Sequence, residues 1–101
     1  MATKTRSLDE IIPLLKELLP DLIEQFHVQT LEVFGSFVRS EESTDSDLDL
    51  LVTFTETPTL FRFVALENHL SDSLGVKVDL VMKNTLKPAL GEYILQEAQP
   101  I

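Results

Sequence analysis

The stretch Gly35-Ser36-Phe37-Val38-Arg39, followed by Asp47-Leu48-Asp49 and the apolar run Leu50-Leu51-Val52, decides the fold of this chain. The apolar residues predict a β-strand over residues 47–54. Because side chains alternate along a strand, Asp47 and Asp49 share one face, about 6–7 Å apart at the backbone. With an effective dielectric constant of about 20, two like charges at that separation repel by roughly 2–3 kcal/mol. The pair therefore predicts a bound cation.

A third acid strengthens this prediction. The run Val76-Lys77-Val78-Asp79-Leu80-Val81 predicts a second strand over residues 76–82, with Asp79 on its less apolar face. If the two strands are neighbours, three carboxylates converge. Such a ligand set suits two Mg²⁺ ions, roughly 3.5–4 Å apart, in phosphoryl or nucleotidyl transfer.

The small residues before the first acids suggest a phosphate-binding turn. Gly35 allows backbone N–H groups to approach phosphate oxygens, and the Ser36 hydroxyl adds a donor. The planar guanidinium of Arg39 would neutralise a triphosphate. Gly35 as a strand terminator, Ser36 as a turn residue and Arg39 as a surface arginine remain alternatives. The sequence contains neither a P-loop nor a dinucleotide-binding glycine motif.

The strings G-S-F-V-R, S-D-L-D-L-L-V and V-D-L-V together resemble the nucleotidyltransferase superfamily of the DNA polymerase β type. The similarity is greatest to its smallest members, the minimal nucleotidyltransferases (MNT), which occur as antitoxins beside HEPN-domain toxins. It covers residues 8–98. One departure is Ser40, where relatives commonly have glycine.

The resemblance implies a Mg²⁺-dependent enzyme, with two ions, that transfers AMP from ATP to a tyrosine of a cognate HEPN ribonuclease toxin and silences it. It implies that Asp47, Asp49 and Asp79 are the catalytic and metal-binding residues. It also implies that Gly35, Ser36 and Arg39 bind the nucleotide. Two alternatives remain: an antitoxin that neutralises its partner by binding alone, and a nucleotidyltransferase that acts on a small molecule.

A calcium loop is a further alternative for the acidic segment. Asp45, Asp47, Asp49 and Glu56 match the ligand spacing of an EF-hand. Leu50 stands where that loop requires glycine, and the residues after it favour a strand. The spacing therefore argues weakly for calcium.

Composition limits the other possibilities. A length of 101 residues predicts a single domain, residues 1–101, and the absence of cysteine excludes disulfides and thiolate metal sites. The formal net charge of −9 disfavours direct nucleic acid binding. It fits either a basic protein partner or a site that becomes less negative once metal ions bind. The sequence predicts neither a membrane span nor a signal peptide, so we expect a cytoplasmic protein.

The remaining segments predict helices. One opens with a capping box at Ser7, kinks at Pro13, breaks at Pro20 and resumes to Phe26. A short strand over residues 30–34 then leads to Gly35.

A second helix begins after the cap Thr57, with Pro58 at its first position, and ends at Gly75. Its predicted buried residues are Leu60, Phe63, Val64, Leu66, Leu70 and Leu74, with Phe61 outside the stripe. A last helix over residues 86–98 turns Leu90, Ile94 and Leu95 inward.

This order predicts an α/β (α+β) fold of two layers, a small mixed β-sheet with helices packed on one face. The resemblance implies that this fold is the palm of a polymerase β-type nucleotidyltransferase.

Overall fold

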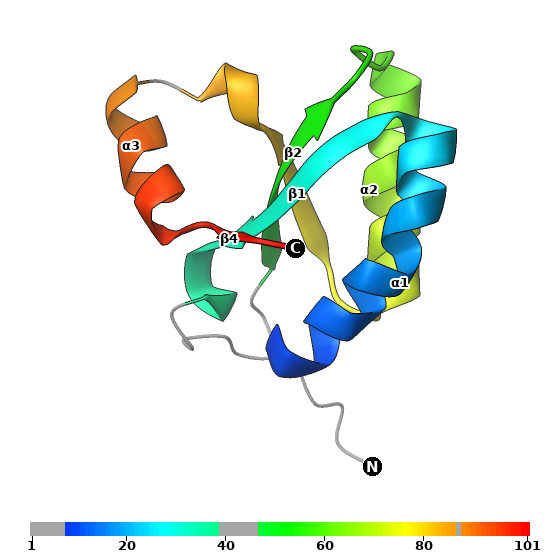
Figure 1. Cartoon of the computed structure of the whole chain (residues 1–101), viewed down its shortest axis with the longest axis horizontal. Coiled ribbons are helices and arrows are strands. Elements are labelled where there is room, and N and C mark those ends of the chain that lie inside the picture. The colour runs from blue at the N-terminus through cyan, green and yellow to red at the C-terminus, as the bar shows by residue number, and fades with distance from the viewer. Residues whose placement is uncertain (1–7, 39–46, 87) are drawn as a thin grey trace.

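The computed structural model describes residues 8–38, 47–86 and 88–101. Its elements are α1 (Leu8–Phe26), β1 (Val28–Phe34), a 3₁₀ turn η1 (Gly35–Phe37), β2 (Leu48–Phe54), α2 (Leu60–Leu74), β3 (Val78–Met82), a 3₁₀ turn η2 (Lys83–Thr85), α3 (Pro88–Glu97) and β4 (Gln99–Pro100). The strands form one mixed sheet in the order β3-β2-β1-β4. Helices α1 and α2 cover one face, and α3 lies on the other side (Figure 1). The predicted α/β class is confirmed, with α3 placed apart from the other two helices.

The sheet presents two unlike faces because its side chains alternate. On the face beneath α1 and α2, β2 contributes the fully buried Leu48 and Leu50, which belong to the single core. Asp49, between them, points to the opposite face. That second face, here called the open face, carries the charged residues of the strands.

Helix α1 is one continuous helix of 19 residues, so the predicted break at Pro20 is wrong. Pro13 and Pro20 stand seven residues apart and both are exposed. Each therefore lies on the outer surface of the helix. The inner stripe of Ile11, Leu15 and Leu22 is fully buried on either side of Pro20. Burial of these three side chains contributes about 5–8 kcal/mol, and Leu14, Leu18, Leu19 and Phe26 also pack against the core. Together they offset the roughly 3 kcal/mol cost of each interior proline.

The start of α2 lies two residues later than the sequence predicts. Thr59, not Thr57, is the N-cap, and its hydroxyl accepts a hydrogen bond from the Arg62 N–H at 3.2 Å. The end is as predicted: Gly75 adopts φ 71° and donates to the Ser71 carbonyl at 3.0 Å.

Burial along α2 is narrower than its apolar residues suggest. The predicted Leu66, Leu70 and Leu74 are fully buried. Leu60 is 78% exposed and Val64 is 43% exposed, so their predicted burial is wrong. Both lie near the N-terminal end of the helix. Phe61 is 89% exposed, as expected for a residue outside the stripe.

Strand β3 is an edge strand, and α2 supplies hydrogen-bond acceptors for it. The Val78 N–H donates to the Ser71 hydroxyl, and the Leu80 N–H donates to the Glu67 carboxylate, both at 2.9 Å. Ser71 and Glu67 are four residues apart, so they lie on the same helix surface. These bonds satisfy edge N–H groups and fix the position of β3 against the helix.

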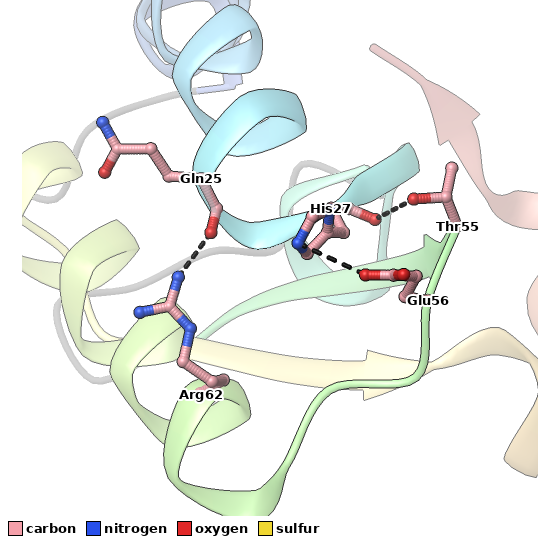
Figure 2. A network of polar contacts seen from close by, with 5 residues as sticks. All are labelled: Gln25, His27, Thr55, Glu56 and Arg62. Carbon is pink, nitrogen blue, oxygen red and sulfur yellow. Dashed lines mark hydrogen bonds and ion pairs between the residues drawn. The ribbon is translucent and has the colours of Figure 1, made fainter.

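Polar contacts from the end of β2 and the start of α2 hold the junction between α1 and β1 (Figure 2). His27 adopts φ 59°, and its carbonyl accepts from the N–H of Thr55 at 2.9 Å and from its hydroxyl at 3.2 Å. Its Nε2 lies 3.4 Å from Glu56 Oε2. The Arg62 guanidinium donates to the Gln25 carbonyl, and α1 has no basic residue in its own last turn. Arg62 therefore supplies the cation that favours a helix C-terminus.

The C-terminal segment folds back onto β1. Gln99 pairs with Val33 and Pro100 with Glu32, and the Ile101 N–H donates to the Leu31 carbonyl at 3.0 Å. The sequence predicts neither this strand nor η2. Leu95, predicted inward, is 44% exposed, whereas Ile94 is half-buried. The side chain of Leu90 lies outside the described residues.

No helix within the described part of the chain combines the length and the apolar character that membrane crossing requires.

The Glu67 carboxylate offers a test of how β3 is held. In Glu67→Ala the half-buried Leu80 N–H loses its acceptor, so we expect unfolding free energy to fall by about 1–3 kcal/mol. We also expect faster hydrogen exchange at the Leu80 amide. Glu67→Gln keeps an acceptor oxygen, so it should keep most of the unfolding free energy and most of the protection of the Leu80 amide from exchange. Glu24→Ala, an exposed glutamate on α1, is the control. Unchanged Leu80 exchange in Glu67→Ala would contradict this role.

Candidate active site

Two predicted site residues lie side by side on the open face. Strands β2 and β3 are parallel, and Asp49 is the direct partner of Asp79. Their Cα atoms are therefore about 4.8 Å apart. Asp49 is half-buried and Asp79 is exposed. Two like charges on adjacent strands repel, and solvent at the exposed Asp79 screens that repulsion. The predicted convergence of these two acids is confirmed at the level of strand register.

Asp47 directly precedes β2, two residues from Asp49. The Leu48 N–H donates to the Lys77 carbonyl at 2.8 Å, which extends the β2–β3 pairing to this end. Asp47 Oδ2 lies 4.0 Å from Lys77 Nζ, and the lysine side chain is 80% exposed. Such a long, exposed ion pair contributes little to stability. Lys77 therefore lies beside Asp47 at the end of the strands without fixing its position.

Among the residues that the structure describes, no three histidine, cysteine, aspartate or glutamate side chains are arranged to hold a metal ion. The backbones of Asp49 and Asp79 are together, but their side chains do not form a closed set of three ligands with Asp47. The metal-binding role of the three aspartates therefore stays a prediction.

The calcium-loop alternative is wrong. The residues that would lead into its second helix, Leu50 and those after it, form β2. Glu56, the last candidate ligand, lies at the other end of β2 and pairs with His27. Asp45 falls outside the described residues.

Gly35 packs directly against the Asp49 carboxylate. A Cβ atom built on Gly35 would lie 2.0 Å from Asp49 Oδ2, a distance that no real side chain could adopt. Gly35 also has φ 83°, a conformation that disfavours other residues. Gly35 is the first residue of the turn η1, which is closed by the Val38 N–H donating to the Gly35 carbonyl at 3.1 Å. Only glycine fits at this position.

The backbone N–H of Gly35 donates to Glu97 Oε2 at 3.0 Å. This N–H is therefore bonded to a carboxylate, and the prediction that backbone N–H groups of the turn approach phosphate oxygens stays a prediction. Glu97 is half-buried, ends α3 and lies 62 residues from Gly35 in the chain. Sequence reasoning missed Glu97, because nothing in the local pattern of α3 distinguishes it from a solvated glutamate.

Two other predicted nucleotide-binding groups lie outside what the structure describes. Ser36 is the middle residue of η1, but its side chain is not described, and Arg39 is outside the described residues. The same holds for Ser40. Their roles stay predictions.

A charged pair that the sequence did not indicate also lies on the open face. Lys83, in η2, reaches Glu32 on β1 with an Nζ–Oε2 distance of 2.8 Å. The Glu32 side chain is only 15% exposed and that of Lys83 is 36% exposed. A charge-assisted bond with this degree of burial helps hold η2 over the sheet. Glu32 is the partner of Leu51, one pair along from the Phe34–Asp49 pair on this face.

Comparison with known proteins identifies the family. A family model described as polymerase beta, nucleotidyltransferase matches residues 16–101. The protein adenylyltransferase MntA of Thermococcus cleftensis is 45% identical over 91 residues, which are 90% of this chain and 92% of that protein.

Solved structures agree in fold. A minimal nucleotidyltransferase structure superposes with a TM-score of 0.82 at 37% identity, covering 98% of this chain and all of that one (100%). A toxin–antitoxin structure with AMP-PNP gives a TM-score of 0.67 at 24% identity, covering 91% of this chain and 69% of that one. A tri-AMPylated Shewanella oneidensis HEPN toxin in complex with MNT antitoxin gives 0.58 at 23% identity, covering 91% and 66%. At these lower identities the likeness shows the fold alone. The chain belongs to the polymerase β nucleotidyltransferase family, among its minimal members.

Proposed function

We propose that this protein transfers the AMP group of ATP to a tyrosine of a cognate HEPN ribonuclease toxin, and so acts as its antitoxin. The observation that carries the proposal is the register of Asp49 and Asp79, with the Gly35 turn against the Asp49 carboxylate. Neighbouring carboxylates beside a turn that only glycine fits suit a metal–triphosphate complex.

The names of the relatives support the choice of nucleotide and acceptor. The MntA relative is named a protein adenylyltransferase, which favours ATP as the donor. One structural neighbour contains AMP-PNP, and another contains an AMPylated HEPN toxin with its MNT antitoxin. The net charge of −9 fits a basic protein partner.

The donor groups on the open face fit Mg²⁺, which prefers oxygen ligands and carboxylates in particular. A cation between Asp49 and Asp79 would also offset their mutual repulsion. Asp47, Asp49 and Asp79 are the proposed ligands. When bound, two Mg²⁺ ions would neutralise charge on the phosphates and favour deprotonation of the acceptor.

The protein's own residues would position the reactants. In the proposed reaction the tyrosine oxygen bonds to the α-phosphorus, the α–β bridging P–O bond breaks, and pyrophosphate leaves. Asp79, which is more exposed than its strand partner Asp49, orients the tyrosine hydroxyl and accepts its proton. The Ser36 hydroxyl donates to a phosphate oxygen, and the Arg39 guanidinium stabilises the charge on the leaving pyrophosphate.

Asp49 and Asp79, which pair across β2 and β3, provide the first test. Asp49→Asn and Asp79→Asn keep the side-chain shape and remove one charge each. We expect each to lower AMP transfer to the partner at least about a hundredfold, measured as labelled AMP on the toxin and by its intact mass. Asp72→Asn, an exposed aspartate on α2, should retain full transfer.

The same variants separate enzyme from binder. If Asp49→Asn neutralises the toxin as well as the unaltered protein does, the binding-only alternative is correct. If the unaltered protein, with ATP and Mg²⁺, adds no AMP mass to its partner, the tyrosine-acceptor proposal fails.

Gly35→Ala tests the close approach of the turn to Asp49. The added methyl group must displace the Asp49 carboxylate, so we expect AMP transfer to fall at least about tenfold, with a stability loss of about 1–3 kcal/mol. Gly75→Ala is the matched control, since Gly75 has a similar φ of 71° at the end of α2. It should lose comparable stability but keep its transfer rate. Equal loss of activity in both would show that backbone strain alone matters.

A further inference from the structure

We infer that Glu97 is a positioning residue of the nucleotide site: its carboxylate fixes the Gly35–Phe37 turn in the shape that accepts a triphosphate. The inference rests on the proposed function and adds a residue from α3 to a site otherwise built by β1, β2 and β3. Glu97 touches neither reactant in this account. It acts through the backbone of Gly35.

The contact itself is direct. Glu97 Oε2 accepts the Gly35 N–H at 3.0 Å in a half-buried setting. Hydrogen bonds to a charged acceptor are about twice as strong as those between neutral groups, and partial burial shields this one from water. A bond of this kind can hold a glycine that would otherwise sample many conformations.

Glu97 is itself held on both sides in the chain. It is the last residue of α3, and the following Ala98 N–H still donates to the Ile94 carbonyl at 2.9 Å. Gln99, two residues on, already pairs with Val33 in β1. The backbone of Glu97 therefore has little conformational freedom, and this restricts the positions that its carboxylate can take beside the turn.

Gly35 is contacted from two directions. The Asp49 carboxylate packs where a Cβ would be, and the Glu97 carboxylate binds the N–H. A shift of Gly35 would therefore alter the setting of Asp49, a proposed metal ligand. This geometry favours a positioning role for Glu97. A rival role, a carboxylate that competes with phosphate for the Gly35 N–H, predicts the opposite effect on nucleotide affinity.

The first measurement is nucleotide affinity. In Glu97→Ala we expect the dissociation constant for AMP-PNP with Mg²⁺, measured by calorimetry, to rise about tenfold. We expect KM for ATP to rise by a similar factor and by more than kcat falls. Glu97→Gln keeps an acceptor oxygen and should remain within about threefold of the unaltered protein. Glu92→Ala, an exposed glutamate on the same helix, is the charge-matched control and should change neither value.

The second measurement needs no activity. The chain has only 3 glycines, so labelling with ¹⁵N-glycine gives one backbone amide signal each for Gly35, Gly75 and Gly91. Loss of the carboxylate in Glu97→Ala should shift the Gly35 signal. The Gly75 signal should stay in place, which also shows that the variant is folded.

The outcomes are distinct. An unmoved Gly35 signal in Glu97→Ala overturns the inference, since the contact would then be absent in solution. If the Gly35 signal moves but the affinity for AMP-PNP is unchanged, Glu97 has a structural role alone. If Glu97→Ala binds AMP-PNP more tightly, Glu97 competes with phosphate for the Gly35 N–H. Either result overturns the inference. If the unaltered protein neither binds AMP-PNP nor transfers AMP, the proposed function fails and the inference fails with it. The Gly35 signal would still report whether the contact exists.

Discussion

The parallel register between β2 and β3 is the constraint on which the rest of the site depends. It sets Asp49 beside Asp79 and the buried Leu48 beside Val78. A slip of one residue would place Asp79 against the core and turn Val78 and Leu80 to the open face. That slip is excluded because it would bury the charge of Asp79 and expose the apolar Val78 and Leu80. The register of the acids is thus specified by their uncharged neighbours.

Helix α2 reinforces this register from the outside. It connects the end of β2 to the start of β3, and its Ser71 and Glu67 accept hydrogen bonds from alternate N–H groups of β3. Those bonds flank Asp79 on both sides, at Val78 and Leu80. The helix therefore acts both as the crossover that makes a parallel pair possible and as the clamp that stops β3 from sliding. Repulsion between the two neighbouring acids is tolerated because the β2–α2–β3 unit is held by its core.

The parts of the structure that the sequence predicts are those set by local pattern. Alternation along residues 48–54 is enough to place Asp49 on the face opposite Leu48 and Leu50, and Gly75 ends α2 for a local steric reason. The errors arise where tertiary contacts outweigh local preference. Pro20 does not break α1, because buried residues on both sides of it hold the helix together. Thr57 and Thr59, on either side of Pro58, are both candidate caps for α2, and the local sequence does not choose between them.

The site combines two halves that depend on different ranges of the chain. The acids of β2 and β3 are fixed by the β2–α2–β3 unit, whose residues lie close together in sequence. The N–H of Gly35 obtains its carboxylate acceptor from Glu97, 62 residues away. That partner reaches its place because β4 pairs with β1 immediately afterwards. The acids therefore leave a signature in spacing and alternation, whereas the Glu97 contact exists only once the C-terminal segment has folded back along β1.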